Sequence, residues 1–439
     1  MKSSKVVYIG LLGLGTVGSG VVKSLASNDS HIEARTGYSV QVRHALVRDI
    51  DKPRRVVIDK ALLTVNPKTI VEDPAIQIVV EVMGGIEPAR SLILQALHAG
   101  KHVITANKEL LAKHGDDLIS VANDMGVRLL FEASVAGGIP IIRMVEAYLT
   151  ANRIFAIRGI LNGTCNYILT QMDERNEPFA DALFSAQELG YAEANPESDV
   201  EGFDAAYKLS ILANMAFPIK SSIGDVVREG ITHVTPVDIV VARHMGAVIK
   251  LLGFAELREG HIMLRVGPRM ISKVDALSSV RDVFNAVTLS ADVVGDLTFI
   301  GRGAGELPTA SAVIEDLMEV LHAPQPRPTR LQLPSVDKSA DEDPVPGNYY
   351  VRVHIQGKVT GEQFMHEAAR VAMAVGGDIV PLVAQHGAIS DACVILCNVQ
   401  ENTAREFARS YSPAAWICLP FDAPLPITGK VAILPLERA

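Results

Sequence analysis

VVYIGLLGLGTVGSGVVKSLAS, residues 6–27, carries the strongest indication of the fold. Residues 6–13 form an apolar run typical of a buried strand, and residues 16–27 have the character of a helix. Between them lies the pattern G-L-G-T-V-G, with Gly13, Gly15 and Gly18 at its fixed positions. Gly13 permits a tight turn, Gly15 lets a pyrophosphate approach the backbone, and Gly18 lets the helix pack closely on the strand. The spacing predicts a dinucleotide site at the helix N-terminus, the alternative being a glycine-bearing turn without ligand.

The rhythm of strand and helix continues through the first third of the chain. Apolar runs at 40–47, 76–83, 101–107 and 127–134 predict further strands. Residues 88–100 have apolar side chains at helical spacing and end at Gly100, a typical helix stop. Strands that alternate with helices indicate a parallel sheet with crossover helices. We therefore expect an α/β Rossmann NAD(P)-binding domain over residues 1–140.

The segment after the second predicted strand bears on the choice of cofactor. This strand ends at Val47, and Arg48 and Asp49 follow it. A carboxylate at such a position binds the ribose hydroxyls of NAD, whereas an arginine accommodates the 2′-phosphate of NADP. Further basic residues follow at positions 52, 54 and 55. The cluster favours NADP through Arg48; Asp49 keeps NAD as the alternative, and a solvated loop is the third interpretation.

Residues 141–300 differ in character and are expected to form a separate α+β catalytic and oligomerisation domain. Helical stretches such as 166–175, 179–190 and 203–217 dominate, and strand-like runs at 153–163 and 261–271 lie between them. The stretch 186–208, AQELGYAEANPESDVEGFDAAYK, is rich in chemistry-bearing side chains. Asp204 and Lys208 are four residues apart on a predicted helix, so their side chains share a face. A lysine on an inward face is a candidate proton donor, the alternative being an exposed ion pair on an ordinary helix.

The C-terminal part follows a proline-rich and charged segment at 323–348, which we interpret as a linker. Beyond it, predicted strands and helices alternate in the order βαββαβ over residues 349–425. This order is typical of a ferredoxin-like domain.

Composition narrows the class of protein. Of the 439 residues, 48% are hydrophobic and 21% charged, and the net charge is −9. These values indicate folded globular domains and disfavour non-specific binding to nucleic acid. No apolar run approaches the roughly 20 residues that a membrane-spanning helix needs. We therefore expect no membrane partner. The chain has too few cysteines for a disulfide framework, which predicts a cytoplasmic protein. They are Cys165, Cys393, Cys397 and Cys418. The pair at 393 and 397 lies in an apolar run and is expected to be buried thiols rather than metal ligands.

A family resemblance rests on the stretch from Ala186 to Lys208, whose pattern is A-x3-G-Y-A-x2-N-P-x2-D-V-x-G-x-D-x3-K. This pattern resembles the signature of homoserine dehydrogenase at every fixed position. Three further stretches agree with the family: TANKELL at 105–111, RGILNGTCNYILT at 158–170 and GRGAGELPTASAV at 301–313. The resemblance covers about residues 5–320. It implies that the segment at about 301–322 returns to complete the Rossmann domain.

The resemblance implies interconversion of L-homoserine and L-aspartate 4-semialdehyde with NAD(P)H, a step toward threonine, methionine and isoleucine. Carried onto this chain, Lys208 is the acid/base, Lys108 lies beside nicotinamide and substrate, and Asp204 positions the substrate hydroxyl or Lys208. Hydride addition to an aldehyde develops negative charge on oxygen, which an ammonium group stabilises and protonates. Two lysines in one site are expected to lower each other's pKa.

The same resemblance assigns the remaining site residues. Substrate binding falls on Glu193, which pairs with the substrate ammonium, and on Asp199, Gly163 and Thr164. Asn162, Gly163 and Thr164 fit equally well a polar turn or a helix cap. Cofactor binding falls on Gly13, Gly15, Thr16, Val17, Gly18, Arg48, Thr105, Lys108, Gly303 and Gly305. A monovalent cation, usually sodium in the family, is expected on Glu132, Val135, Gly137 and Ile139, the alternative being a glycine-rich turn without a cation.

The tail resembles an ACT-type regulatory domain, which makes threonine a candidate effector. ACT domains that bind an amino acid often carry a D-x-P-G turn after the first strand, whereas this chain has QGKVTG at 356–361 without proline. A role mainly in oligomer contacts is therefore the alternative. The family is usually dimeric or tetrameric, and a homodimer or homotetramer is expected. Two other functions stay open: a related Rossmann dehydrogenase for another amino-acid-derived carbonyl, and a non-catalytic nucleotide-binding sensor.

Overall fold

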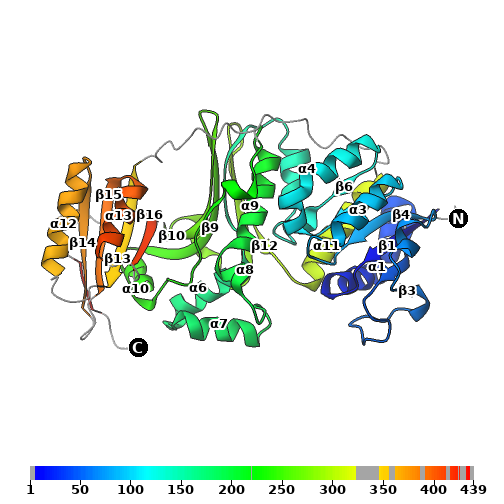
Figure 1. Ribbon diagram of the computed structural model, residues 1–439, viewed down its shortest axis with the longest axis horizontal. Helices are drawn as coiled ribbons and strands as arrows, with labels where there is room; N and C mark the ends of the chain where they lie inside the picture. The colour runs from blue at the N-terminus through cyan, green and yellow to red at the C-terminus, as the bar shows by residue number, and fades with distance from the viewer. Residues whose placement is uncertain are drawn as a thin grey trace.

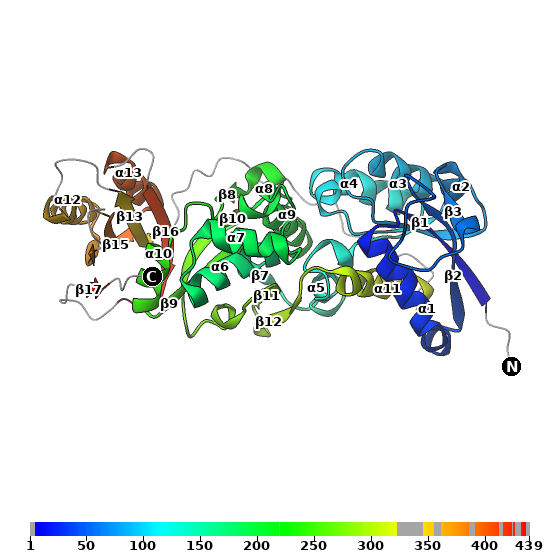
Figure 2. The same cartoon turned by 90° about the horizontal axis from the view of Figure 1, so that it is seen from below.

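A computed structural model describes residues 5–218, 220–322, 346–354, 361–385, 391–411, 416–423, 425 and 432–435. The molecule is elongated, with the N-terminal sheet at one end, a larger sheet in the middle and the C-terminal strands at the other end (Figures 1 and 2). The predicted linker lies for the most part at residues 323–345, outside the described residues. No helix of the described part is long and apolar enough to cross a membrane.

The N-terminal sheet has six parallel strands in the order β3-β2-β1-β4-β5-β6. They are β1 (Lys5–Leu12), β2 (Tyr38–Leu46), β3 (Leu63–Thr64), β4 (Ile76–Glu81), β5 (His102–Thr105) and β6 (Leu129–Leu130). The strand order reverses between β1 and β4, and ligands of such sheets bind at the carboxyl ends beside this reversal. The predicted Rossmann-like parallel sheet is confirmed. The short strand β3 was not anticipated.

Helices cover both faces of this sheet (Figure 2). They are α1 (Thr16–Thr36), α2 (Lys68–Val71), α3 (Ala89–His98), α4 (Lys108–Asp124) and α11 (Glu306–His322). Helix α1 continues to Thr36, well beyond the predicted stretch, and ends at Gly37 in a left-handed conformation. Helix α11 returns from the middle of the chain and packs on α1, where a Cβ at Gly20 would lie 2.6 Å from the carbonyl oxygen of Glu306. Only glycine allows this close approach.

The middle sheet contains antiparallel strands in the order β12-β11-β7-β9-β10. They are β7 (Ile154–Ile160), β9 (Ala247–Arg258), β10 (His261–Ser272), β11 (Phe284–Ala291) and β12 (Gly295–Arg302), and β8 (Val227–Arg228) adds to β10 in parallel. Helices α6 and α9 pack on these strands. The helices of this part are α5 (Ile141–Arg143), α6 (Gly163–Arg175), α7 (Phe179–Glu188), α8 (Glu197–Val200), α9 (Phe203–Ala216) and α10 (Pro236–His244).

Short helical turns connect the larger elements. They are η1 (Lys60–Leu62), η2 (Glu132–Ser134), η3 (Met144–Tyr148), η4 (Ile223–Asp225) and η5 (Ala276–Ser279). The two that matter for the site are η2 and η3, because they flank the glycine-containing loop after β6.

The C-terminal elements follow the predicted strand and helix order. They are β13 (Gly347–His354), α12 (Gly361–Ala374), β14 (Asp378–Gln385), β15 (Asp391–Val399), α13 (Glu401–Tyr411), β16 (Trp416–Asp422) and β17 (Ala432–Pro435). Strand β16 pairs with β13 and also, in parallel, with β10 through Met270–Phe421 and Ile271–Asp422. The middle and C-terminal sheets are thus continuous, which was not anticipated. Cys393 and Cys397 are free and buried, as expected, and Cys165 and Cys418 are free and buried as well.

Candidate active site

Three predicted catalytic side chains meet between the N-terminal and middle domains. Lys108 is the first residue of α4, and Asp204 and Lys208 lie one turn apart on α9. Helices α4 and α9 pack against each other, which brings together groups far apart in the sequence. The Lys208 ammonium is 2.6 Å from Oδ2 of Asp204, and the Lys108 ammonium is 3.2 Å from Oδ1 of the same carboxylate. The predicted shared face of Asp204 and Lys208 is confirmed by this contact.

Lys208 is a buried charge with its hydrogen bonds satisfied. Its side chain is 9% exposed, and its ammonium donates to the carbonyl oxygen of Leu161 at 2.8 Å in addition to Asp204. A buried ammonium is tolerated only when charge and hydrogen bonds compensate the loss of water. Lys108 is 43% exposed and thus reaches the solvent side of the same carboxylate. The pair therefore presents one fixed and one accessible ammonium.

Asn162 joins the two carboxylates of the site, a role that the sequence did not reveal. Its Nδ2 donates to Oδ1 of Asp199 at 2.6 Å and to Oδ2 of Asp204 at 2.9 Å. Its Oδ1 accepts from the backbone N–H of Cys165 and thereby caps α6. The helix-cap interpretation of this segment is confirmed for Asn162. The cap fixes the amide in the orientation that bridges the carboxylates.

Burial and charge act in opposite directions on the carboxylates. Burial alone would raise the pKa of Asp204, but Lys208 and Lys108 outweigh it and hold that pKa well below the ordinary value. Burial, together with the charge of Asp204, raises the pKa of Asp199. The carboxylate of Asp204 raises the pKa of Lys108, and Asp199 and Glu193 add to this effect. The expectation that the two lysines would lower each other's pKa is wrong for Lys108, because it overlooked the carboxylate between them.

The predicted substrate residues surround this cluster. Glu193 is exposed and close enough to Lys108 to affect its pKa. Thr164 is engaged within the protein, since its hydroxyl donates to the carbonyl oxygen of Tyr191 at 2.7 Å. Gly163 begins α6, where a Cβ would lie 2.7 Å from the carbonyl oxygen of Val283. These positions form one face of the site, with Glu193 as the free carboxylate at its rim.

The glycine-rich turn after β1 has the geometry of a dinucleotide site. Gly13 has φ of +110°, a conformation that side chains disfavour. Nothing lies within 4 Å of a Cβ placed on Gly15, whereas one on Gly18 would lie 2.4 Å from the carbonyl oxygen of Gly13. Open space at the second glycine and tight packing at the third match the roles that the motif predicts. The next residues, Thr16 and Val17, form the first turn of α1, where the N–H groups favour an anion.

A buried network at the carboxyl ends of β4 and β5 supports Lys108. The Thr105 hydroxyl donates to Glu81 at 2.6 Å, and both side chains are fully buried. Glu81 also accepts from the N–H groups of Met83 and Gly84. Asn107 caps α4 and donates to the carbonyl oxygen of Gly85 at 2.6 Å. The network fixes the start of α4 relative to the sheet, and Glu81 and Asn107 were not among the predicted residues.

The other predicted cofactor residues lie at two separate places. Arg48 is exposed just beyond β2, as a residue beside the adenosine ribose should be. Gly303 and Gly305 precede α11, and a Cβ on Gly303 would collide with the side chain of Asn285. Asn285 is 1% exposed, and its amide has no hydrogen-bond partner among the described residues.

The loop predicted to hold a cation curls tightly after β6. Ala136 and Gly137 have φ of +53° and +46°. Val135 and Gly137 are buried, and within the described part of the chain no donor reaches either carbonyl oxygen. Buried carbonyl groups without a partner are rare. The Glu132 carboxylate accepts from the N–H groups of Ile142 and Arg143, and the carbonyl oxygens of Glu132 and Ile139 accept from the N–H groups of Val135 and Ile141. Among the described residues, the carbonyl oxygens of Val135 and Gly137 thus stay available as ligands and fit a hard monovalent cation.

Comparison with known proteins identifies the family. A model described as homoserine dehydrogenase matches residues 140–318, and the model of its NAD-binding domain matches residues 13–132. A Synechocystis homoserine dehydrogenase is 48% identical over 319 residues, which cover 72% of this chain and 73% of that protein. The crystal structure of a Thiobacillus denitrificans homoserine dehydrogenase has a TM-score of 0.85 at 37% identity and covers 95% of this chain and 99% of its own.

A hyperthermophilic archaeal homoserine dehydrogenase, solved in complex with NADPH, has a TM-score of 0.62 at 26% identity. It covers 73% of this chain and 100% of its own. These matches give no support to the two alternative functions. The chain belongs to the homoserine dehydrogenase family and is an NAD(P)-dependent oxidoreductase that interconverts L-homoserine and L-aspartate 4-semialdehyde.

Proposed function

We propose that Lys208 is the acid/base of the reaction and that Lys108 shares the stabilisation of the substrate oxygen. The observation that carries this assignment is the single carboxylate of Asp204 between both ammonium groups, at 2.6 and 3.2 Å. Negative charge that develops on the aldehyde oxygen is best stabilised by fixed positive groups that need no reorganisation. Asp204 and the carbonyl oxygen of Leu161 fix the Lys208 ammonium in one orientation.

The neighbouring groups have distinct roles in this proposal. Glu193, exposed at the rim, pairs with the substrate ammonium, and Asp199 supports the network through Asn162. Gly163 and Thr164 form the wall on which the substrate rests. Thr164 acts through its backbone, because its hydroxyl already donates to Tyr191.

NADP is the preferred cofactor in this proposal, with NAD as the alternative. When bound, the nicotinamide supplies or accepts the hydride. The pyrophosphate lies on Gly13, Gly15, Thr16, Val17 and Gly18, the nicotinamide end near Thr105, Lys108, Gly303 and Gly305, and the 2′-phosphate beside Arg48. A spectrophotometric assay of homoserine oxidation with NADP and with NAD tests this: a higher kcat/KM with NADP is expected, and the reverse order would reject the preference.

We propose that the loop after β6 binds a monovalent cation, with sodium as the candidate, through backbone oxygens of Glu132, Val135, Gly137 and Ile139. The carbonyl groups of Val135 and Gly137, which accept no hydrogen bond from the residues that the structure describes, support this. Such a cation would fix the loop against the 301–305 segment, since Gly138 N–H donates to the carbonyl oxygen of Arg302. Thermal unfolding in sodium chloride and in choline chloride at equal ionic strength tests this proposal. Equal midpoint temperatures in the two salts would reject the cation site.

The C-terminal elements are proposed to form an ACT-type regulatory domain with threonine as effector. Their strand and helix order supports this proposal, while the QGKVTG turn lies for the most part outside the described residues. Initial rates of homoserine oxidation titrated with threonine test it, and unchanged rates would leave oligomer contacts as the role of the domain. A cytoplasmic homodimer or homotetramer is proposed as well; the buried free thiols fit a reducing compartment, and sedimentation gives the subunit number.

A further inference from the structure

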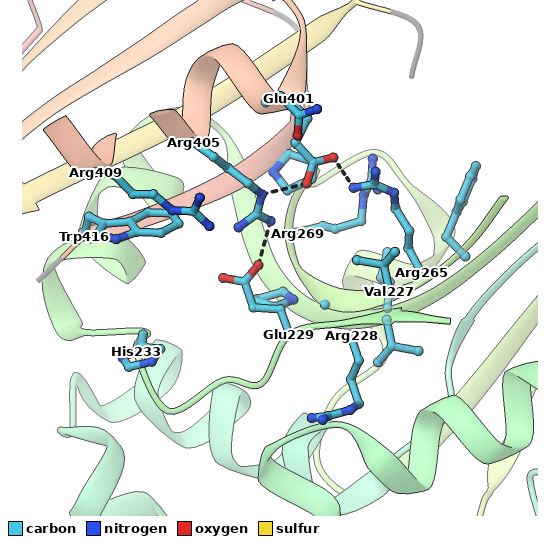
Figure 3. A pocket seen from close by; sticks show the side chains of 17 residues that line it. Val227, Arg228, Glu229, His233, Arg265, Arg269, Glu401, Arg405, Arg409 and Trp416 are labelled. Atoms are coloured by element: carbon cyan, nitrogen blue, oxygen red, sulfur yellow. Dashed lines mark hydrogen bonds and ion pairs between the residues drawn. The ribbon is translucent and has the colours of Figure 1, made fainter. Parts of the chain in front are cut away.

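A cavity of about 660 Å³ lies between the middle and C-terminal domains (Figure 3). The N-terminal sheet with the glycine-rich turn lies at the other end of the molecule (Figure 1). Strands β8 and β10 form one wall, and α13 and β16 form the other. The parallel pairing of β16 with β10 holds the two walls together. The cavity is thus a permanent feature of the domain junction.

Positive charge dominates the lining of this cavity. Five arginines face two glutamates there: Arg228, Arg265, Arg269, Arg405 and Arg409 against Glu229 and Glu401. Arg405 bridges the walls, because it contacts Glu401 at 2.8 Å on its own helix and Glu229 at 2.7 Å on the other side. Arg265 also pairs with Glu401. Arg269 pairs with Asp422 at 2.8 Å. Three of the five arginines are therefore engaged with carboxylates, and Arg228 and Arg409 are the two without an ion pair among the described residues.

Arg409 is the least compensated of these cations. It is exposed, and among the described residues it forms no ion pair. Its guanidinium lies 5.4 Å from the ring centroid of Trp416, and that of Arg405 lies 5.9 Å from the same ring (Figure 3). A guanidinium group that lies on an aromatic face without an ion pair, as that of Arg409 does, keeps its in-plane N–H donors available for an anion. This corner of the cavity thus has the chemistry of an anion site.

The opposite wall leads directly to the catalytic helices. Arg228 donates to the carbonyl oxygen of Glu201, and its guanidinium stacks 3.4 Å from the ring centroid of Phe203. Glu201 directly follows α8, which carries Asp199, and Phe203 begins α9, which carries Asp204. The connection after β8 adds a bond from Ile231 N–H to the carbonyl oxygen of Val200 at 2.8 Å. One layer of residues therefore separates the cavity from the turn between α8 and α9.

We propose that this cavity binds a small organic dianion, a phosphate ester or a dicarboxylate, and that its occupancy changes the activity through Arg228 and the α8–α9 turn. The anion contacts Arg409 and Arg405 beside Trp416, whereas Arg228 points away from them toward Phe203 (Figure 3). The anion competes with Glu229 for Arg405. Because Glu229 directly follows Arg228 in the chain, its release loosens the contact of Arg228 with the carbonyl oxygen of Glu201. This site is separate from the threonine effector proposed above and does not depend on it.

Trp416, the single tryptophan of the chain, provides a readout that does not require activity. Titration of the full-length enzyme with glycerol 2-phosphate or with succinate is expected to change its fluorescence saturably. Sodium chloride at equal ionic strength is the control for screening. Glycerol 2-phosphate, a phosphate ester, and succinate, a dicarboxylate, distinguish the two sources of the dianion. The absence of a saturable change in fluorescence, and of binding heat, with both probes overturns the proposal.

Arg409→Gln locates the site. This variant should weaken binding of the effective probe about tenfold, the loss of one charge-assisted contact. Because the side chain is exposed, the fold is preserved. Arg370→Gln, on the surface of α12, is the matched control and should bind as the unchanged enzyme does. Equal binding to both variants and to the parent enzyme would show that the anion binds elsewhere.

Arg228→Lys tests the route to the active site. Lysine keeps the positive charge but loses the planar stack on Phe203. The probe should still bind this variant, as Trp416 reports, while its effect on kcat/KM for homoserine disappears. In the unchanged enzyme a bound probe should alter kcat/KM several-fold. A probe that saturates the cavity and leaves kcat and KM unchanged would overturn the regulatory part of the proposal.

Discussion

The carboxylate of Asp204 lies between two ammonium groups, with Oδ2 at 2.6 Å from Nζ of Lys208 and Oδ1 at 3.2 Å from Nζ of Lys108. Both lysines hold the pKa of Asp204 low, although burial opposes them. The lowered pKa favours the charged form of this carboxylate. We therefore expect Asp204 to align both cations and not to donate a proton itself.

Removal of the buried ammonium should affect chemistry and not cofactor binding. Lys208→Ala is expected to lower kcat by on the order of a hundredfold, the usual loss when a general acid is removed. The Kd of NADPH, measured by fluorescence, should barely change, because Lys208 lies on α9 and not on the glycine-rich turn. Lys273→Ala, an exposed lysine of the same domain, is the control. Near-normal kcat in Lys208→Ala would reject the assignment.

The charge of Asp204 should also be visible in the pH profile. In Asp204→Asn the opposite charge that raises the pKa of Lys108 is lost, so that pKa falls. If a protonated lysine is required, the alkaline limb of log kcat/KM moves to lower pH. Glu109→Gln, which removes a half-buried carboxylate paired with Lys113 in the same turn of α4, should leave the limb in place. If the alkaline limb of Asp204→Asn lies at the same pH as that of the unchanged enzyme, Asp204 does not raise the pKa of the required lysine.

Two substitutions of Asn162 separate its two functions. Asn162→Asp keeps the oxygen that caps α6 but loses the amide that joins Asp199 to Asp204, and it places a third negative charge beside them. We expect kcat to fall by at least about tenfold, with stability lowered as well. Asn162→Ala also removes the cap, which costs about 1 kcal/mol. Urea unfolding and steady-state rates measure both effects. Full activity in both variants would show that Asn162 only caps the helix.

Sequence reasoning succeeded where the information is local. The glycine-rich turn was predicted because each glycine has a separate steric reason, and the structure places Gly13, Gly15 and Gly18 in those three environments. The contact of Asp204 with Lys208 was predicted because helical spacing alone puts both on one face. The strands and helices of the C-terminal part were found from their apolar periodicity in the same way.

The features that the sequence did not predict are contacts between segments that lie far apart in the chain. The approach of Lys108 to Asp204 depends on how α4 packs on α9, which no local pattern encodes. For the same reason the raised pKa of Lys108 was missed. The apolar residues of β16 predict a strand but do not indicate whether its second edge is free or paired with β10. The continuous sheet could therefore not be predicted from the sequence. Asn162 was noted as a cap or ligand, but its bridge requires the position of α8.

Cofactor preference should change with the arginine after β2. Arg48→Ala is expected to raise KM for NADP about tenfold and to leave KM for NAD nearly unchanged, because only NADP carries the 2′-phosphate. The ratio of the two kcat/KM values is the decisive measurement. Arg35→Ala, in the last turn of α1, removes equal charge at the far end of that helix and serves as the control. An equal loss with both cofactors would place the 2′-phosphate elsewhere.

The junction of the middle and C-terminal domains should depend on a buried ion pair. Arg352 contacts Asp238 through Nε at 2.7 Å and through Nη2 at 3.1 Å, and Asp238 is fully buried. The hydroxyl of Tyr350 donates to the same carboxylate at 2.9 Å. Asp238 also accepts from Thr235 and closes the capping box of α10. Loss of the guanidinium therefore leaves a buried carboxylate that the helix cap still requires.

Arg352→Met should destabilise the protein by about 3–5 kcal/mol, as expected when one partner of a buried pair is removed. The change in free energy of unfolding is measured by urea titration, with tryptophan fluorescence reporting the environment of Trp416 on the adjoining strand. Arg370→Met, which removes an exposed arginine from α12, should stay within about 0.5 kcal/mol of the parent. If both variants unfold at the same urea concentration, the ion pair does not hold the junction, and the continuous sheet between β10 and β16 is the main link.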